Sequence, residues 1–394
     1  MNSFFRIELA YHDLANEIVQ QLPEELFKSS STTFLDPAFA GGQFILAIAH
    51  RLHKYGHSID NIKSRIFGYE RSVVYKNYPT NKKLDFISNL SIIPYNEFFS
   101  KTPNMNFDVV VGNPPFKGNG KTPLYAKFHN KGMEVLKPNG LLALISPTAI
   151  ATAFEKGHIG PKTKVTVGEL ELLNMDDRIK TDYFSGVGST FCYYIMRNKV
   201  SSGDDYKVIF GNGQEEITKV NVLTISASNP ITRSIISKAF SYKANPYNAV
   251  WCCAGTSVTV GSGDSKVVDA INADGTLDTI PAVTERHKFA GRPKVFVAAF
   301  GNRAVVNYDY EIVAGNKNMI VTVPTDSDEQ GERLVHLLNC NLQLFLNKIL
   351  GRGERTAFLF HFKGVPLDRY WTNDELYQYF NLTDEEINHI TETI

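Results

Sequence analysis

The chain has 394 residues, which is enough for two domains with separate hydrophobic cores. It contains 41 Lys and Arg residues and 41 Asp and Glu residues, so its formal net charge is zero. This balance excludes a protein that binds a polyanion through the charge of the whole molecule. Binding to a nucleic acid would instead require a local basic surface.

The four cysteines show no spacing typical of a metal site. They include the adjacent pair Cys252 and Cys253, and neighbouring cysteines seldom form a structural disulfide. The sequence has neither a signal-peptide pattern nor an apolar stretch of membrane-spanning length. We therefore expect a cytoplasmic protein that binds no metal and contacts no membrane.

The first part of the chain predicts a helix over residues 9–22, a strand over 33–36 and a helix over 43–55. Between the strand and the second helix lies the tight turn Pro37-Ala38-Phe39-Ala40-Gly41-Gly42. A strand, a glycine-containing turn and a helix N-terminus in this order form a pocket typical of nucleotide binding. An ordinary strand-turn-helix unit is the alternative interpretation.

Two more strands are predicted over residues 65–70 and 90–93. The first ends in Glu70, whose carboxylate could accept hydrogen bonds from both hydroxyls of a ribose. The second leads into residues 95–99, where the Asn96 side chain can accept a further hydrogen bond. The alternative interpretation of Glu70 is an ordinary side chain exposed to solvent.

The next strand, predicted over residues 107–112, leads into Asn113-Pro114-Pro115-Phe116. Two consecutive prolines fix φ and keep the preceding residue out of helical geometry. The Asn113 side-chain oxygen and the neighbouring backbone carbonyl can then converge on one point, beside the flat face of Phe116. This loop suits a planar amine, although a plain strand-terminating loop is the alternative.

The tetrapeptide resembles motif IV of the S-adenosylmethionine-dependent amino-methyltransferases, which reads Asn/Asp-Pro-Pro-Tyr/Phe in the N6-adenine enzymes. The turn over residues 37–42 resembles motif I of the same family. It departs from that motif at Ala40, where the first glycine is expected, and at Gly41, where serine is common. Gly42 and Phe44 match the motif.

The resemblance implies site residues for both the reaction and the cofactor. Catalytic roles fall on Asn113, Pro114, Pro115 and Phe116. Glu70 corresponds to the ribose-binding acid of motif II, Asn96 to motif III, where the family usually has Asp, and Tyr11 to motif X. The residues implied to bind S-adenosylmethionine are Asp36, Pro37, Ala38, Gly42, Glu70, Asn96 and Tyr11.

Residues 115–122 approach the phosphate-binding pattern G-x-x-x-x-G-K-[ST], but its first position is Pro115. Proline has no N–H to donate to a phosphate and cannot adopt positive φ, which argues against an NTPase. We instead expect Lys117 and Lys121 to contact a nucleic-acid backbone beside the catalytic loop. An ordinary solvated surface is the alternative.

Further along, a helix is predicted over residues 124–136 and a strand over 140–146. Residues 178–184 and 189–196 then predict two strands of an antiparallel hairpin. In the adenine methyltransferases such a hairpin carries an aromatic residue that stacks on the extruded base. The resemblance assigns this role to Phe184, with Tyr183 as the substitute and a buried core aromatic as the alternative.

The motif order, with cofactor motifs first and the catalytic loop second, resembles the gamma arrangement of N6-adenine DNA methyltransferases. The resemblance implies an α/β fold: a Rossmann-like domain with a mostly parallel sheet and a terminal antiparallel hairpin, then a smaller α+β recognition domain. We expect the methyltransferase domain over residues 1–200, a connecting region over 201–245 and the target-recognition domain over 246–394.

The carboxyl-terminal half predicts a strand pair over residues 208–222, a helix over 230–240, several short strands and a helix over 330–350. Basic residues gather there, some of them beside glycines. Such loops let guanidinium groups reach base edges or phosphates, although pairing with acids is equally open. The candidate DNA-binding residues of this half are Arg286, Lys288, Arg292, Arg303, Arg352 and Arg355.

These features predict transfer of a methyl group from S-adenosylmethionine to the N6 amino group of adenine in double-stranded DNA, after base flipping. The resemblance implies a bacterial or phage-encoded protein, with a cognate restriction endonuclease as a candidate partner. The alternatives are methylation of adenine in RNA, methylation of a glutamine amide in a protein, and an inactive methyltransferase fold that binds DNA.

Overall fold

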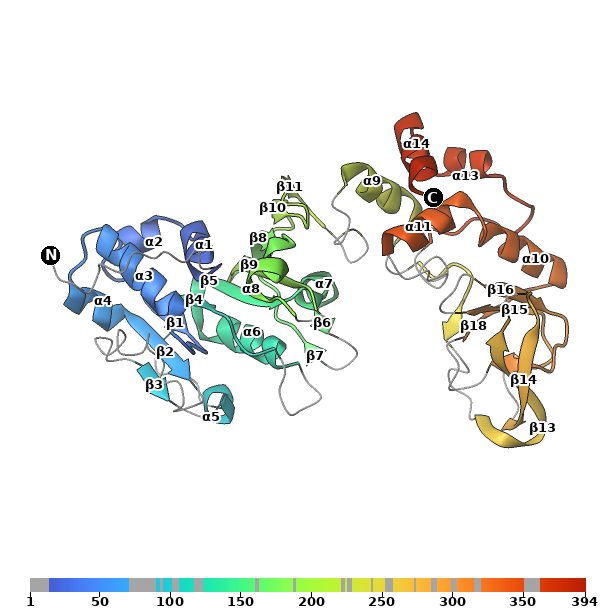
Figure 1. Ribbon diagram of the computed structural model, residues 1–394, viewed down its shortest axis with the longest axis horizontal. Helices are drawn as coiled ribbons and strands as arrows, with labels where there is room; N and C mark the ends of the chain where they lie inside the picture. Colours follow the sequence, from blue (N-terminus) through green and yellow to red (C-terminus); the bar gives the residue numbers. More distant parts are fainter. Residues whose placement is uncertain are drawn as a thin grey trace. The chain divides into compact units, whose positions relative to one another are not determined.

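The computed structural model describes residues 14–70, 90–92, 95–100, 106–116, 123–159, 163–186, 189–220, 224, 229–241, 244–251, 258–272, 274–284, 289–298, 303–314, 320–350 and 362–394. The chain divides into two compact units, Met1–Ile225 and Ser226–Ile394 (Figure 1).

The first unit is built on a nine-stranded sheet with the order β11-β10-β8-β9-β5-β4-β1-β2-β3. Five of the strand pairs are parallel and three are antiparallel. The sheet strands are β1 (Phe34–Asp36), β2 (Ile66–Glu70), β3 (Leu90–Ile92), β4 (Phe107–Gly112), β5 (Leu136–Pro147), β8 (Glu169–Asn174), β9 (Phe191–Arg197), β10 (Tyr206–Ile209) and β11 (Glu215–Thr218). A separate short pair consists of β6 (His158–Ile159) and β7 (Thr163–Lys164).

Helices cover both faces of this sheet (Figure 1). Along β4, Val109 and Val111 pack into a core shared with α1 and α3, whereas Val110 packs into a second core shared with α6. Because successive strand residues face opposite sides, an apolar run such as β4 is buried on both. The helices of this unit are α1 (Leu14–Gln21), α2 (Glu25–Lys28), α3 (Gln43–Lys54), α4 (Ile59–Arg65), α5 (Tyr95–Ser100), α6 (Leu124–Val135), α7 (Ala149–Lys156) and α8 (Arg178–Tyr183).

The predicted fold class is confirmed, since the sheet is mostly parallel and an additional smaller unit follows it. The predicted strand over residues 178–184 is wrong, because this segment forms helix α8. Only Ile179 is buried there, and the Asp176 carboxylate accepts a hydrogen bond from the Arg178 N–H at 2.9 Å, which favours a helix start. The strands that pair antiparallel with β9 are β5 and β8.

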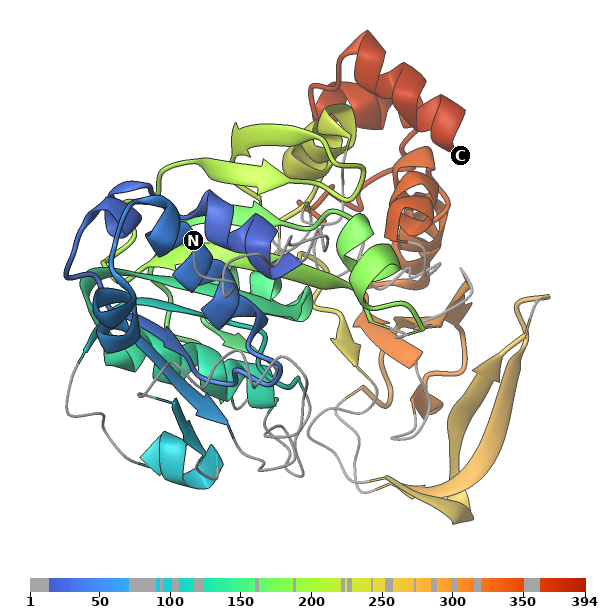
Figure 2. The ribbon, with the colours of Figure 1, turned by 60° about the vertical axis from the view of Figure 1, so that its left-hand side comes forward.

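The second unit contains a four-stranded sheet, β12-β18-β15-β16, and a three-stranded sheet, β14-β13-β17. Strands β13 and β14 form a long curved ribbon, drawn in yellow (Figure 2). The strands are β12 (Val250–Trp251), β13 (Val258–Ile271), β14 (Leu277–Thr284), β15 (Lys294–Ala298), β16 (Ala304–Asn307), β17 (Val313–Ala314) and β18 (Ile320–Pro324). The helices are α9 (Pro230–Ala239), α10 (Asp328–Leu337), α11 (Asn341–Leu350), α13 (Asn373–Tyr379) and α14 (Asp384–Thr393).

Two details of the chain after residue 200 differ from expectation. The single helix predicted over residues 330–350 is two helices, α10 and α11, because the Asn341 N–H at the start of α11 donates to the Asn373 side chain at 2.8 Å. Residues 206–218, expected in a connecting region, form the edge strands β10 and β11 of the first unit.

Two kinds of feature are absent from the described ranges. No helix there has the length and apolar character needed to span a bilayer. No group of three or more His, Cys, Asp or Glu side chains in the same ranges could hold a metal ion.

The turn between β1 and α3 is held by hydrogen bonds from two strands. The Asp36 carboxyl accepts from the Ala38 N–H at 3.1 Å, and the Glu70 carboxylate accepts from the Ala40 N–H at 3.0 Å. The Phe39 N–H also donates to the Tyr69 carbonyl, at 3.1 Å. The end of β2 therefore fixes the turn that follows β1.

Two residues of this turn have left-handed backbone conformations. Gly42, which precedes the first residue of α3, has a φ of 77°, and Ala40 has a φ of 43°. The left-handed region suits glycine, whereas the Cβ of alanine costs roughly 1–2 kcal/mol there. Ala40 thus occupies a position whose backbone favours the glycine that the methyltransferase motif has.

Replacing Ala40 with glycine should stabilise the first unit. The A40G variant loses the clash of Cβ with the backbone, and this gain exceeds the greater chain entropy of glycine, so we expect the free energy of unfolding to rise by about 0.5–1 kcal/mol. Urea unfolding followed by circular dichroism measures the change. A38G serves as the control, since the Ala38 backbone is not left-handed, and it should lower stability. An A40G protein less stable than the parent would contradict this account.

Candidate active site

The carboxyl ends of β1 and β4 lie side by side, because these strands pair in parallel with Leu35 opposite Val110. The chain passes from β1 to β2 and β3 on one side, and then returns to β4 on the other side of β1. Such a reversal of strand order is the usual position of a ligand site in open α/β sheets. Asp36 ends β1 here, and Asn113 directly follows β4.

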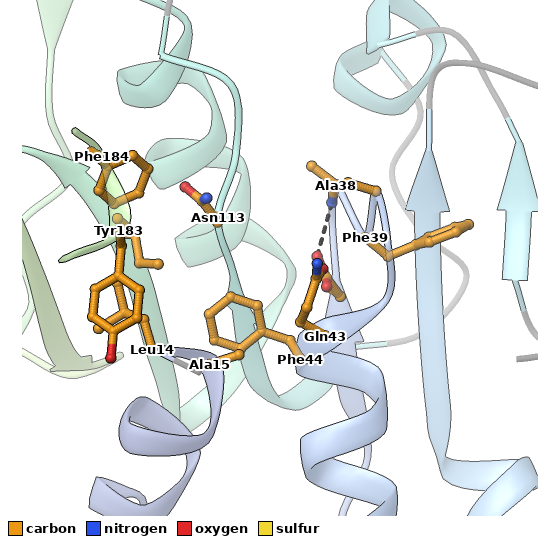
Figure 3. A pocket seen from close by; sticks show the side chains of 12 residues that line it. Leu14, Ala15, Ala38, Phe39, Gln43, Phe44, Asn113, Tyr183 and Phe184 are labelled. Carbon is orange, nitrogen blue, oxygen red and sulfur yellow. Dashed lines mark hydrogen bonds between the residues drawn. The ribbon is translucent and has the colours of Figure 1, made fainter. Parts of the chain in front are cut away.

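A cavity of about 290 Å³ opens at this point. Figure 3 shows Asn113, Phe184 and Tyr183 on one side of it, and the turn after β1 on the other. Its lining residues are Leu14, Ala15, Asp36, Ala38, Phe39, Ala40, Gln43, Phe44, Asn113, Ile145, Tyr183 and Phe184. The cavity is therefore mainly apolar, with a few polar groups among the apolar ones.

Asp36 is the buried acid of the cavity, with 2% of its surface exposed. Burial raises the pKa of its carboxyl to about 8, and the nearby Glu70 carboxylate acts in the same direction, while the Ala38 N–H opposes the shift. Near neutral pH the carboxyl is therefore largely protonated. A positive charge placed in the cavity would favour the ionised form and would be stabilised by it.

Glu70 is buried at the end of β2 and does not line the cavity. One of its carboxylate oxygens accepts the hydrogen bond from the Ala40 N–H described above. In this arrangement the acid holds the turn, and ligand contacts from it remain a proposal.

Of the four residues expected to be catalytic, Asn113 lines the cavity. It is exposed, whereas Pro114 behind it is buried, and Pro115 and Phe116 are half-buried. The buried proline anchors the loop to the sheet, so that the Asn113 side chain projects from a fixed backbone.

Phe184 also lines the cavity, and its neighbour Tyr183 is 38% exposed there. The ring of Phe184 lies 6.0 Å from the ring of Phe116, measured between centroids. The structure thus brings together the two aromatic rings that were expected on either side of a flat base.

Several predicted residues lie outside the described part of the chain. They are Tyr11, Lys117, Lys121, Arg286, Lys288, Arg352 and Arg355. Asn96 lies in α5. The proposed roles of these residues remain predictions.

Two candidate DNA contacts of the second unit are described, and both are exposed. Arg292 lies just before β15, and Arg303 donates from its guanidinium to the Ile271 carbonyl at 2.6 Å. Lys294, close to both in sequence, is fully buried, and its ammonium donates to the carbonyls of Arg292 and Tyr310 at 2.8 Å each. A run of basic residues in the sequence is therefore not a continuous basic surface here.

Sequence reasoning missed much of the cavity wall. Gln43 is polar, and its side chain folds over Gly41, to within 2.9 Å of where a Cβ at Gly41 would lie. The sequence also carried no signal for Leu14 and Ala15 of α1 and Ile145 of β5, which are apolar. Apolar residues at helix and strand spacing indicate a core, and nothing in the sequence distinguishes a cavity wall from one.

Comparison with known proteins gives one family match. Residues 44–158 match the family described as the Eco57I restriction-modification methylase. This segment includes β4, Asn113 and the two prolines. No curated protein matches the chain.

Solved structures share a distant likeness. A modification subunit of a putative type I restriction enzyme from Vibrio vulnificus YJ016 is 15% identical, with 50% of this chain and 46% of that chain covered, at a TM-score of 0.38. A putative class I S-adenosylmethionine-dependent methyltransferase from Listeria monocytogenes is 13% identical, with 57% and 67% covered, at a TM-score of 0.35. The type IIG restriction endonuclease BpuSI is 12% identical, with 97% and 66% covered, at a TM-score of 0.44.

The chain spans about half the length of the type I modification subunits that it matches, with 46% and 49% of two of them covered. The resemblance to methyltransferases that the motifs predicted is confirmed by the family match, so that residues 44–158 carry the pattern of a restriction-modification methylase.

Proposed function

We propose that this protein transfers a methyl group from S-adenosylmethionine to the N6 amino group of adenine in a specific double-stranded DNA sequence. The observation that carries the proposal is the position of Asn113. Its side chain lines the cavity that also contains Asp36, at the reversal point of a methyltransferase-like sheet. The family match over residues 44–158 supports a restriction-modification methylase.

The residues around the cavity fit S-adenosylmethionine. The cofactor carries a sulfonium and an ammonium group, and the Asp36 carboxyl is placed to become their counter-charge. Phe44 and Ala38 supply apolar contacts beside it, and Gly42, without a side chain, leaves room next to the turn. When bound, S-adenosylmethionine supplies an electrophilic methyl group. We assign its binding to Asp36, Pro37, Ala38 and Gly42, with Glu70, Asn96 and Tyr11 for the remaining parts.

The low nucleophilicity of the adenine N6 amine determines what the protein has to supply. The N6 lone pair is delocalised into the ring, so the nitrogen is a poor nucleophile. If the Asn113 side-chain oxygen and the Pro114 carbonyl each accept one N6 hydrogen, the lone pair is directed toward the methyl group. The same oxygen dipoles stabilise the positive charge that develops on N6 as the methyl group leaves the sulfur, with S-adenosylhomocysteine as the leaving group. The methylated nitrogen then loses one hydrogen as a proton to water, so that positioning and electrostatics replace a strong base.

Adenine N6 lies inside the duplex, so the base has to leave the stack to reach Asn113. Phe116 and Phe184 are the rings available to hold it once it is extruded. Phe116 belongs to the catalytic loop, and a centroid separation of 6.0 Å between its ring and that of Phe184 supports this proposal.

Recognition of the DNA sequence is assigned to the second unit, and a restriction endonuclease is the expected functional partner. The cofactor and catalytic motifs lie in the first unit, whereas the exposed Arg292 and Arg303 lie in the second. Phosphate contacts fix the register of a protein on DNA, and contacts with base edges supply the specificity. This split implies that binding of cofactor and reading of sequence are separable.

Replacing Asn113 with alanine should abolish methyl transfer and leave cofactor affinity nearly unchanged. The side-chain oxygen acts on the amine and not on the sulfonium, and loss of one such partner lowers a rate by about 100-fold or more. Transfer of labelled methyl groups to DNA and calorimetry with S-adenosylmethionine measure the two effects. N113D, which keeps an acceptor oxygen, serves as the matched variant and should retain more activity. An alanine variant with more than about a tenth of the parent rate would refute the role of Asn113.

Binding of S-adenosylmethionine should release up to about one proton at pH 7, because the cationic cofactor lowers the pKa of Asp36 from about 8. The observed heat of binding should therefore depend on the ionisation enthalpy of the buffer. Affinity should rise with pH between about pH 6 and pH 8, since the ionised carboxyl binds the cation.

Two controls test whether the released proton comes from Asp36. S-adenosylhomocysteine lacks the sulfonium charge and should release less, and the D36N variant should show no buffer-dependent heat. Equal heats in phosphate and Tris with the parent protein would show that Asp36 does not change its ionisation on binding.

A chain that ends at Ile225 should bind S-adenosylmethionine and lose discrimination between specific and scrambled duplexes. The truncated protein keeps the complete nine-stranded sheet, and circular dichroism verifies its fold. Weak, salt-sensitive binding to any duplex is expected to remain, because phosphate contacts carry no sequence information. If the truncated chain discriminates as well as the full chain, the second unit is not the recognition domain.

A further inference from the structure

Three phenylalanine rings meet beside the catalytic loop. Phe191 begins β9 and is 3% exposed. Its ring stacks on the ring of Phe184 at a centroid distance of 4.4 Å and an interplanar angle of 29°, and it lies 5.0 Å from the ring of Phe116. Phe191 therefore contacts both rings that are proposed to hold the extruded base.

The distance between the rings of Phe116 and Phe184 is slightly less than a base between them requires. The centroids of Phe116 and Phe184 are 6.0 Å apart, and their planes are inclined by 57°. A flat base between two parallel rings requires a ring separation of roughly 7 Å, twice the contact distance of carbon atoms. The two rings thus have to separate by about 1 Å and become more nearly parallel.

Phe191 is the fixed member of the three. It belongs to a central strand, since β9 pairs with β5 on one side and β8 on the other, and it lies opposite Pro147. Phe184 instead follows the six-residue helix α8, and Phe116 ends the loop after β4. A buried ring that contacts both others is in a position to limit how closely they approach each other.

We infer that Phe191 is a positioning residue for the target base: it holds the rings of Phe116 and Phe184 apart, so that an extruded adenine enters between them. This inference rests on the proposed function and adds to it a residue with no direct role in the chemistry. Phe191 does not line the cavity that contains Asp36, so its removal should leave cofactor binding intact.

The test compares F191A and F191L with F210A in the full-length protein. Phe210 is a buried phenylalanine of the other core of the same unit, so F210A controls for loss of core volume alone. The duplex contains the DNA sequence that the parent enzyme methylates, with 2-aminopurine in place of the target adenine. The fluorescence of 2-aminopurine shows whether this base has left the duplex and whether it is then stacked on another ring. Calorimetry gives the affinity for S-adenosylmethionine.

F191A should lower kcat/KM for DNA by about tenfold or more, the loss expected for two aromatic contacts, and should change the fluorescence of the extruded base. Its cofactor affinity should stay within about twofold of the parent. F191L keeps most of the side-chain volume, so its kcat/KM should lie between the values for the parent and F191A. If F191A does not fold, the comparison is made with F191L. F210A should change stability without changing the fluorescence.

Three results would overturn the inference. In the first, F191A or F191L matches F210A in its DNA parameters. In the second, cofactor affinity falls together with kcat/KM, which indicates a merely structural role. In the third, the parent protein neither methylates adenine nor changes the fluorescence, in which case the proposed function fails and the inference fails with it.

Discussion

The site depends on one close contact, between the Asp36 carboxyl at the end of β1 and the backbone of Gly112 at the end of β4. A Cβ at Gly112 would lie 2.8 Å from an oxygen of Asp36 and 3.3 Å from Pro37. Only glycine lets the acid of the first turn and the strand that carries Asn113 come this close. The parallel pairing of β1 with β4 then places a buried acid and an exposed amide in one cavity.

A second constraint is the support of the turn by its neighbours. The turn contains Ala40 in a left-handed conformation, and hydrogen bonds to Asp36 and Glu70 hold it there. Strain of this kind persists only where surrounding contacts determine the backbone. The departure of this chain from the glycine of the methyltransferase motif is therefore compensated by its own carboxylates.

Local patterns were sufficient to predict the parts of the fold that carry the motifs. β1, β4 and the turn after β1 are short buried runs with clear ends, and the sequence places Asp36 and Asn113 at those ends. The sequence could not show that α8 is a helix, because the alternation of Ile179, Thr181 and Tyr183 also fits a strand. In the structure Ile179 is the buried residue of this helix, and the Asp176 carboxylate accepts from the Arg178 N–H at its start. Lys294 shows the same limit for charge, since one of the two carbonyls that accept from its ammonium belongs to Tyr310, 16 residues along the chain.

The identity of the methylated nucleoside tests the central claim most directly. The full chain is incubated with S-adenosylmethionine and unmethylated DNA, and the DNA is then digested to nucleosides for mass spectrometry and sequenced for the modified position. We expect N6-methyladenine, at one sequence context only. Methyl groups on cytosine, or none in DNA under conditions where calorimetry shows bound cofactor, would contradict the assignment of Asn113 and its loop to adenine.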